Sequence, residues 1–525
     1  MGPRRGRPPP PHLDLDRPHP ISSGRGDLLL VARARLLLAS LSPRPLPKMT
    51  DPVSYDLIVI GAGQGGGPLA GAVAEAGHDV ALLERRHVGG TCVNRGCTPT
   101  KTMIASARVA HLARRAGDYG VETGDVSVDL ETVRQRKRDI VGMFRSGSRS
   151  SIEEKDTLDL IEGDGRFVDP NTVEVTLNGD ANDGGPRALT ADRIVINTGT
   201  RPAIPPIDGL DAVDFLTSTS IMELGAVPGH LLILGGGYIG LEFGQMFRRF
   251  GAEVTIIDRG EHVLGREDAD VAGALEDILR EDGIRLLNET SMTAVEEAGG
   301  TITAHLEGDD APARITGDEL LVAAGRRPNT DALNPGAAGV ATTEQGYVQV
   351  DARLATTADG IYAIGDVTGG PAFTHVSYDD YRVLQDHWLH GGDRTTEDRL
   401  IAYTLFTDPQ LGRVGLTEEQ ARSRGLDVTV AQMPMTRVAR ALEVDETRGL
   451  MKAVIDSTTN RLLGAAVLGI EGGEVMSVLQ TAMMGDLPVG RLRAAPFAHP
   501  TLAESLNNLF AGLDLGPAAE RRADG

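Results

Sequence analysis

The chain has 525 residues, of which 41% are hydrophobic and only 4% aromatic, and its formal net charge is −22. This length predicts about three or four domains, and the many glycines with few aromatic residues favour α/β packing over a β-sandwich. The negative charge argues against nucleic acid and anionic membrane surfaces as partners. No apolar run approaches the ~20 residues that a membrane helix needs, so we expect a soluble, cytoplasmic protein.

Residues 1–48 differ in composition from the rest of the chain. They contain nine Lys or Arg, three Asp, a proline run, and Leu-rich patches that Arg33 and Arg35 interrupt. A signal peptide needs an uninterrupted apolar core, and the prolines oppose the amphipathic helix of an organelle transit sequence. We therefore expect Met49 to be the working start and residues 1–48 to be disordered, dispensable and outside the fold.

The first motif after Met49 is that of a dinucleotide-binding unit. A buried-strand pattern over residues 55–60 leads into a glycine-rich turn over 61–66, a small-residue helix through 76, and a strand that ends at Glu84. In such a unit Gly61 makes the tight turn, and Gly63 lets the backbone approach a pyrophosphate at the helix N-terminus. Gly66 allows the helix to pack on the strand, and Glu84 accepts from ribose hydroxyls.

The two cysteines of the chain, Cys92 and Cys97, follow in a single glycine-flanked loop. On a regular helix their Cα atoms would lie roughly 8.6 Å apart, whereas a disulfide needs about 4.4–6.8 Å. A bridge therefore requires an interrupted helix start, for which Gly96 has the backbone freedom. We interpret the cysteines as a redox pair. Two unpaired buried thiols, or a zinc half-site that no second Cys/His cluster completes, are the alternatives.

The dinucleotide pattern returns in the middle of the chain. A strand over residues 230–234 leads into Gly235-Gly236-Gly237-Tyr238-Ile239-Gly240, a helix through 250, and a strand that ends at Asp258. The first glycine and the acid are 23 positions apart in both copies. One such motif is a weak signal, but two in full context predict two dinucleotides. We expect one bound flavin and one exchanging nicotinamide.

Three further strands end in turns, and a last region has its own pattern. Strands that stop near Gly199 and Gly325 suit domain boundaries, and another offers Asp366 at a turn. From about residue 400, short strands alternate with helices, as in a separate α/β domain.

From about residue 54 to 510 the chain resembles the class I pyridine nucleotide–disulfide oxidoreductases. This family includes dihydrolipoyl dehydrogenase, glutathione reductase and mercuric reductase. The resemblance implies an α/β fold with two Rossmann-type dinucleotide-binding domains, for FAD and NAD(P), and a C-terminal α/β dimerisation domain. Six motifs carry it in the family's order: 61–66, 89–101, 235–242, 325–329, 360–366 and 499–504. The implied segments are 49–202 and 327–398 for FAD, 203–326 for NAD(P), 399–514 for dimerisation, and a tail over 515–525.

The resemblance also implies roles for single residues. Cys97 would face the flavin and form the charge-transfer thiolate, and Cys92 would be the thiol that meets the second substrate. Lys101 would approach the flavin N5 edge and pair with Glu242, while Tyr238 could cover the nicotinamide pocket. Asp366 would bind the ribityl chain of FAD. The other implied contacts of FAD are Gly61, Gly63, Gly66, Glu84, Thr198 and Gly199. The remaining implied cofactor-binding residues are Gly235, Gly237, Tyr238, Gly240, Asp258, Gly325 and Arg326.

His499 and Glu504 are the candidates for acid–base work. A carboxylate carried on a helix after Pro500 could orient the imidazole, and a cis His499–Pro500 bond would fix the ring's approach. The alternative is a loop histidine before a helix that Pro500 starts. By resemblance, His499 would serve the active site of the other subunit in an obligate symmetric homodimer, with residues from about 400 forming most of the interface.

The expected function is electron transfer from NAD(P)H through FAD and a Cys92–Cys97 disulfide to a small disulfide or dithiol substrate, as in dihydrolipoyl dehydrogenase. NADH is favoured because Asp258 would repel a 2′-phosphate, although Arg259 beside it could turn towards that phosphate. No metal is predicted as a resident cofactor.

Two alternatives stay open. Residues 97–120 look like a bacterial branch labelled mercuric reductase or FAD-containing oxidoreductase, which makes metal-ion reduction possible. However, the chain retains His499 and lacks the cysteine pair near the C-terminus and the N-terminal metal-binding domain of that branch. An alternative of another class is a non-catalytic, flavin-binding redox sensor. The cysteine pair and the pairs Lys101–Glu242 and His499–Glu504 argue against it, because a sensor or scaffold needs none of them.

Overall fold

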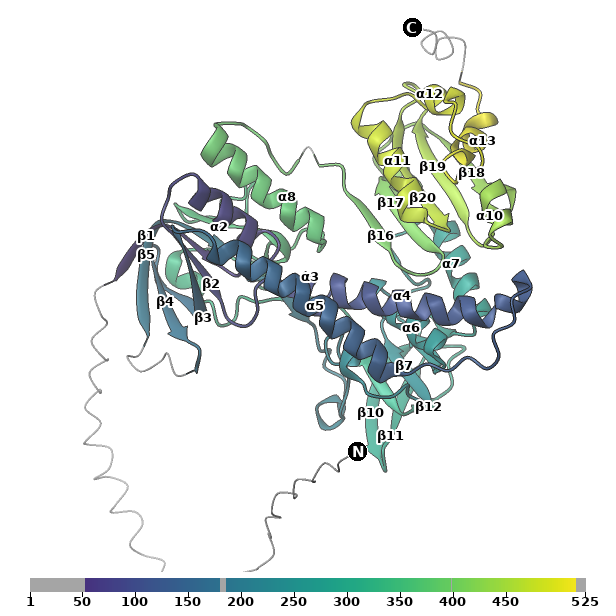
Figure 1. The fold of residues 1–525 in the computed structure, drawn as a ribbon, viewed down its shortest axis with the longest axis horizontal. Coiled ribbons are helices and arrows are strands. Elements are labelled where there is room, and N and C mark those ends of the chain that lie inside the picture. Colours follow the sequence, from purple (N-terminus) through teal and green to yellow (C-terminus); the bar gives the residue numbers. More distant parts are fainter. Residues whose placement is uncertain (1–51, 180–185, 398, 516–525) are drawn as a thin grey trace, which may run out of the picture. The chain divides into compact units, whose positions relative to one another are not determined.

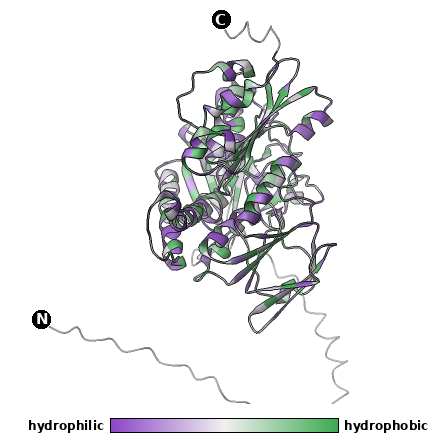
Figure 2. Cartoon of the chain, turned by 90° about the vertical axis from the view of Figure 1, so that its right-hand side faces the viewer, coloured by the Kyte–Doolittle hydropathy of each residue, from purple (hydrophilic) through white to green (hydrophobic). Residues whose placement is uncertain are grey.

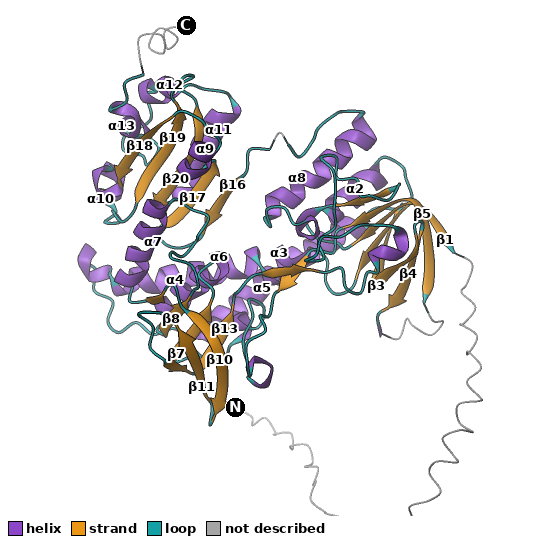
Figure 3. Ribbon diagram, turned by 180° about the vertical axis from the view of Figure 1, so that it is seen from behind, coloured by secondary structure: helices purple, strands orange, loops and turns teal. Residues whose placement is uncertain are grey.

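The computed structural model describes residues 52–179, 186–397 and 399–515, which belong to one compact unit. The expectations for residues 1–48 lie outside the described residues. None of the helices in these three ranges combines the length and apolar character that crossing a bilayer requires. Figure 1 shows the elements in chain order, and Figure 3 shows the same helices and strands from behind.

The first sheet carries the first glycine-rich turn. Its strands follow the order β1-β2-β3-β4-β5-β15, and β1 also pairs with β5. Strand β1 is parallel to β2 and β5, whereas β4 is antiparallel to β3 and β5. The last four residues of β1 are buried because parallel strands are covered on both faces. The strands are β1 (Val53–Ile60), β2 (Val80–Glu84), β3 (Leu158–Asp169), β4 (Thr172–Leu177), β5 (Arg187–Ile196) and β15 (Ile361–Ala363).

Helices α2 (Gly66–Glu75) and α8 (Thr374–Gln385) pack against each other beside this sheet (Figure 1). Three further helices follow β2, namely α3 (Gly90–Arg95), α4 (Cys97–Arg114) and α5 (Leu130–Glu153). Between α3 and α4, Gly96 has φ −130° and ψ −112°, which is not helical. This confirms the predicted interruption of the helix between the two cysteines.

The second glycine-rich turn belongs to a parallel sheet of order β13-β7-β8-β9. Its elements are β7 (His230–Leu234), α6 (Tyr238–Phe250), β8 (Glu253–Ile257), α7 (Ala269–Glu281), β9 (Arg285–Leu287) and β13 (Glu319–Val322). An antiparallel meander of β10 (Ser291–Ala298), β11 (Thr301–Glu307) and β12 (Arg314–Gly317) accompanies it. Helix α4 joins this core, because Met103 and Ala107 are buried in the same apolar cluster as Leu231 and Phe243.

The two strand endings that the sequence marked as boundaries lie side by side. Strand β6 (Thr200–Pro202) pairs antiparallel with β14 (Arg326–Pro328), with Pro202 opposite Arg326 and Thr200 opposite Pro328. The two chain crossings between the sheets are therefore joined into one short ribbon.

The C-terminal region forms an antiparallel sheet of order β16-β17-β20-β19-β18. Figure 2 shows hydrophobic residues along its strands, and Met451, Ala453 and Val467 are fully buried there. The strands are β16 (Ala402–Leu405), β17 (Gln410–Gly415), β18 (Val428–Pro434), β19 (Leu450–Asp456) and β20 (Leu462–Gly469). The helices are α9 (Glu418–Ser423), α10 (Ala439–Glu443), α11 (Gly472–Met484), α12 (Val489–Ala494) and α13 (Ser505–Ala511). The prediction of short strands with helices after residue 400 is confirmed.

Candidate functional site

A cavity of about 1580 Å³ brings most of the predicted site residues together. Both glycine-rich turns and both cysteines line it, together with residues from the β6–β14 ribbon and from β16. The predicted residues along its wall are Gly61, Gly63, Glu84, Cys92, Cys97, Lys101, Thr198, Gly199, Gly235, Gly237, Tyr238, Glu242, Asp258, Gly325, Arg326 and Asp366.

The first glycine-rich turn has no room for side chains at its key positions. Gly61 has φ +112°, and a Cβ atom there would lie 2.4 Å from the Asn197 carbonyl oxygen. A Cβ atom on Gly66 would lie 2.2 Å from the Gly61 carbonyl oxygen, to which Asn197 Nδ2 donates at 2.8 Å. Glu84 Oε2 accepts from the backbone N–H of Ala62 at 3.1 Å. The acid therefore lies beside the turn, where a dinucleotide ribose binds.

The second turn repeats this geometry. Gly235 has φ +113°, and a Cβ atom on Gly240 would lie 2.0 Å from the Gly235 carbonyl oxygen. The Asp258 carboxylate is held by two backbone N–H groups, since Oδ2 accepts from Gly236 at 2.6 Å and Oδ1 from Gly260 at 2.7 Å. Asp258 is thus fixed in orientation at the end of β8.

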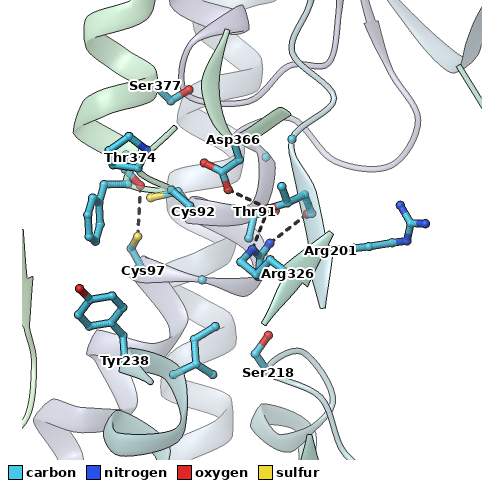
Figure 4. A pocket seen from close by; sticks show the side chains of 18 of the residues that line it. Thr91, Cys92, Cys97, Arg201, Ser218, Tyr238, Arg326, Asp366, Thr374 and Ser377 are labelled. Carbon is cyan, nitrogen blue, oxygen red and sulfur yellow. Dashed lines mark hydrogen bonds between the residues drawn. The ribbon is translucent and has the colours of Figure 1, made fainter. Parts of the chain in front are cut away.

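The cysteines lie on two consecutive helices, with Cys92 on α3 and Cys97 as the first residue of α4. Both are free thiols, Cys92 half-buried and Cys97 exposed. Figure 4 shows Cys97 Sγ facing Thr374, whose Oγ1 lies 3.2 Å away. A hydrogen bond from Cys92 lowers the pKa of Cys97 to about 6, with further help from Thr374 and Lys101. The same hydrogen bond, followed by burial, raises the pKa of Cys92. Of the two thiols, Cys97 is therefore the more readily deprotonated.

Lys101 forms an ion pair with a buried carboxylate. Its Nζ lies 2.7 Å from Oε2 and 2.9 Å from Oε1 of Glu242, whose side chain is 7% exposed. Glu242 Oε1 also accepts from the backbone N–H of Phe406 at 3.0 Å, and Lys101 Nζ lies 4.8 Å from the Phe406 ring centroid. The contacts link α4, α6 and the residue after β16, so Lys101 is not an ordinary surface lysine.

Tyr238 begins α6 and rests against a stack of rings. Its ring meets Phe373 and Tyr403 edge-on, with centroid distances of 5.9 and 5.3 Å. Phe373 in turn stacks on Tyr403 at 5.3 Å and on His375 at 5.4 Å. Burial raises the pKa of Tyr238 to about 12, so its phenol stays neutral.

A chain of hydrogen bonds holds Asp366 in the cavity wall (Figure 4). Thr200 Oγ1 donates to Asp366 Oδ2 at 2.9 Å and accepts from Arg326 Nε at 2.7 Å. The backbone N–H of Gly365 donates to Oδ2 of the buried Asp380 at 2.6 Å. Asp366 and Arg326, which the sequence suggested separately, are thus coupled through Thr200.

The residues along the first turn fit FAD. Thr198 Oγ1, at the end of β5, is buried without a hydrogen-bond partner among the described residues. The turn at Gly61 and Gly63 presents backbone to the cavity, and Glu84 and Asp366 offer carboxylate oxygens at separate places on its wall. This donor set suits a pyrophosphate, a ribose and a ribityl chain in succession.

His499 and Glu504 pair with each other away from this cavity. His499 Nδ1 lies 2.9 Å from Glu504 Oε2, the His499 side chain is 71% exposed, and the His499–Pro500 bond is cis. Neither residue lines the cavity. The carboxylate that we expected to orient the ring is present, but it is not carried within a helix, and the alternative of a helix started by Pro500 is not found. Helix α13 begins at Ser505, and Glu504 lies at its N-cap.

Some residues around the site had not been predicted. Asn197 supports the first turn, and Thr374, Phe373 and Tyr403 surround Cys97 and Tyr238. Asn197 directly follows the buried strand β5, and this position of a polar residue could have marked it as a site residue. Nothing in the sequence connects Thr374 with Cys97, because 277 positions separate them.

Two family patterns match the chain. The one described as pyridine nucleotide-disulphide oxidoreductase covers residues 55–380. The dimerisation domain of pyridine nucleotide-disulphide oxidoreductases covers residues 401–510.

Curated relatives align over most of the chain. A probable pyridine nucleotide-disulfide oxidoreductase, RclA of Escherichia coli, is 38% identical over 87% of this chain and 98% of its own length. A mercuric reductase of Lysinibacillus sphaericus is 36% identical over 86% of this chain and 81% of its own. A dihydrolipoyl dehydrogenase of Geobacillus stearothermophilus is 30% identical over 86% and 94%.

A solved structure agrees with these matches. The Cu(II) complex of the HOCl-induced flavoprotein disulfide reductase RclA from Escherichia coli superposes with a TM-score of 0.79 at 37% sequence identity. It covers 87% of this chain and 100% of its own.

Proposed function

The chain belongs to the pyridine nucleotide-disulphide oxidoreductase family, and from that premise we propose that its Cys92–Cys97 pair reduces a small-molecule disulfide. Family membership makes the protein a flavin-dependent NAD(P)H–disulfide oxidoreductase with FAD as cofactor. The matched dimerisation domain supports a homodimer.

The observation that carries the proposal is the asymmetry of the two thiols. Cys97 has a pKa of about 6, chiefly because Cys92 donates a hydrogen bond to it, whereas the pKa of Cys92 is raised. Bound FAD supplies the two-electron carrier between the nicotinamide and the dithiol. The thiol that keeps its proton is the one to attack an outside disulfide after losing that proton to a base.

Sulfur exchange then proceeds in two displacements. Cys92, once deprotonated, attacks one sulfur of the substrate disulfide, which forms a mixed disulfide and releases the first substrate thiolate. Cys97 attacks the Cys92 sulfur, which closes the Cys92–Cys97 disulfide and releases the second. Two substrate thiols form as one protein dithiol is oxidised, and the two electrons that restore the dithiol would come from the reduced nicotinamide.

We assign the proton transfers to His499 of the partner subunit, oriented by Glu504. The exposed imidazole paired to a carboxylate at 2.9 Å supports an acid–base role. Within one chain, His499 and Glu504 do not line the cavity, which suits a pair that serves the cavity of the other subunit in a dimer. We further propose residues 399–514 as the dimerisation domain, and residues 49–202, 203–326 and 327–398 as the cofactor domains.

NADH is proposed as the preferred electron donor. The fixed carboxylate of Asp258 can accept from ribose hydroxyls and would repel a 2′-phosphate. Arg259 also lines the cavity, and its guanidinium could turn towards the 2′-phosphate of NADPH. A cytoplasmic location suits a catalytic rather than a structural cysteine pair.

Metal-ion reduction is the second candidate function. Several relatives are named mercuric reductase, and the RclA structure was solved as a Cu(II) complex. Two thiols in one cavity are suitable ligands for a soft metal ion. Metal delivery would not need the imidazole of His499, which separates the two candidates experimentally.

The test is a parallel assay of the full chain with NADH and lipoamide, other small disulfides, Hg(II) or Cu(II). We expect disulfide turnover, and a loss of about 100-fold in His499→Ala, as for a lost general acid–base. His305→Ala, which changes an exposed histidine on β11, serves as the matched control and should behave as wild type. Rapid Hg(II) or Cu(II) reduction that ignores His499, with no disulfide turnover, would favour the metal reductase.

A further inference from the structure

We propose that the hydroxyl of Thr374 is a catalytic group that donates a hydrogen bond to the Cys97 sulfur and holds it as the thiolate. The inference rests on the proposed function, in which Cys97 is the thiolate of the Cys92–Cys97 pair. It adds a residue that neither the cysteine motif nor the glycine-rich turns contain.

The first support is the direct contact. Thr374 Oγ1 lies 3.2 Å from Cys97 Sγ, within the range of a hydrogen bond to sulfur, and Figure 4 shows the two side chains pointing toward each other. A thiolate has no proton to give, so the hydroxyl must be the donor once Cys97 is ionised.

The second support is the meeting of two helix starts. Cys97 is the first residue of the 18-residue helix α4, and Thr374 is the first residue of the 12-residue helix α8. The N-terminus of a helix carries a partial positive charge. Neither helix has a side-chain cap, so both N-termini favour an anion at the sulfur between them.

The third support is the rigidity of the segment that carries Thr374. The ring of the preceding Phe373 stacks on the rings of Tyr403 and His375, with centroid distances of 5.3 and 5.4 Å. His375 Nε2 is fixed 2.6 Å from the Ala402 carbonyl oxygen. The residues on either side of Thr374 are therefore held by β16, which keeps its hydroxyl in place.

Other groups also set the charge of Cys97. Cys92 on α3 donates to it and Lys101 on α4 attracts the thiolate, whereas Glu242 on α6 repels it. Removing the Thr374 donor takes away one stabilising contact and leaves the carboxylate, so the pKa of Cys97 must rise. The thiolate is then lost between the old and the new pKa as the pH falls.

The experiment uses Cys92→Ser protein, in which Cys97 is the only thiol of the chain. The rate of Cys97 alkylation by iodoacetamide, followed by mass spectrometry as a function of pH, reports the thiolate without any turnover. We expect Thr374→Val to raise the midpoint by about one pH unit, the effect of a hydrogen bond to a charged group. Thr374→Ser should restore the midpoint, and Thr293→Val on β10 should leave it unchanged.

An unchanged midpoint in Thr374→Val would overturn the proposal. If that variant does not fold, Thr374→Ala and Thr374→Ser are compared: a higher midpoint in alanine alone supports the hydroxyl, and equal midpoints refute it. The alkylation result can be told apart from a failure of the proposed disulfide reduction by Cys92 and Cys97. Disulfide turnover that survives both Cys92→Ser and Cys97→Ser would refute the proposed function, whatever the alkylation midpoints are.

Discussion

The two glycine-rich turns share one backbone geometry but differ in how they are enclosed. Gly61 and Gly235 have φ +112° and +113°, and in both turns the last glycine lies against the carbonyl of the first. In the first turn, a Cβ atom on Gly63 would meet Asn197 Nδ2 at 3.1 Å. In the second, a Cβ atom on the equivalent Gly237 would have no such neighbour within 4 Å among the described residues.

Segments distant in the sequence make this difference. A Cβ atom on Gly65 would lie 2.7 Å from the Ser377 carbonyl oxygen of α8, and one on Gly90 would lie 2.7 Å from Gly63 Cα. The glycine motif thus determines the conformation of the turn, while the surrounding segments determine how open the turn is to a ligand. An enclosed turn suits a resident cofactor such as FAD, and an open turn suits a nicotinamide that must exchange in every cycle.

The largest expected effect comes from placing a methyl group in the middle of each turn. Gly63→Ala should weaken FAD retention about tenfold or more, because overpacking an enclosed site is costly. Gly237→Ala should retain full flavin content and raise only the KM for the nicotinamide. Flavin absorbance per protein and steady-state kinetics measure both. Equal flavin loss in the two variants would remove the proposed distinction.

The next effect concerns the acid beside the open turn. Asp258→Ala should lower kcat/KM for NADH about tenfold, because hydrogen bonds to a charged group are lost, and should narrow the preference over NADPH. Asp277→Ala, at an exposed site on α7, is the control. If wild type already has a higher kcat/KM with NADPH, the assignment of Asp258 is wrong.

The smallest expected effect comes from removing the side chain of Asn197, which supports the first, enclosed turn. Asn197→Ala removes the hydrogen bond from Nδ2 to the Gly61 carbonyl oxygen, and should lower the free energy of unfolding by about 1 kcal/mol. Asn178→Ala, at an exposed position, provides the comparison. Denaturant titration of the holoprotein measures the change. Identical stability in the two variants would show that Asn197 does not support the turn.

Much of this fold could be predicted from local patterns. The strand, turn, helix, strand and acid order of both units lies within short segments, and so does the interruption at Gly96. The antiparallel pairing of β4 with β3 and β5 was not predicted, because it closes the first sheet through contacts that no local period encodes.

The candidate site was predictable in its motifs and not in its neighbours. Cys92, Cys97 and the glycines stand in recognisable spacings, and the pairing of Lys101 with Glu242 followed from the family resemblance. Thr374 and Asn197 reach the site from α8 and from the end of β5, so only the folded chain brings them to Cys97 and Gly61. The role of His499 depends on a second subunit and stays a prediction.

The central claim is that electrons pass from the enclosed flavin to Cys97 and then to Cys92. The most direct measurement is the absorbance spectrum of the Cys92→Ser and Cys97→Ser proteins with oxidised FAD bound, before any NADH is added. Cys92→Ser should show a long-wavelength charge-transfer band without disulfide turnover, because the Cys97 thiolate remains beside the oxidised flavin, and Cys97→Ser should show no band. Full disulfide reductase activity in both variants would contradict the account.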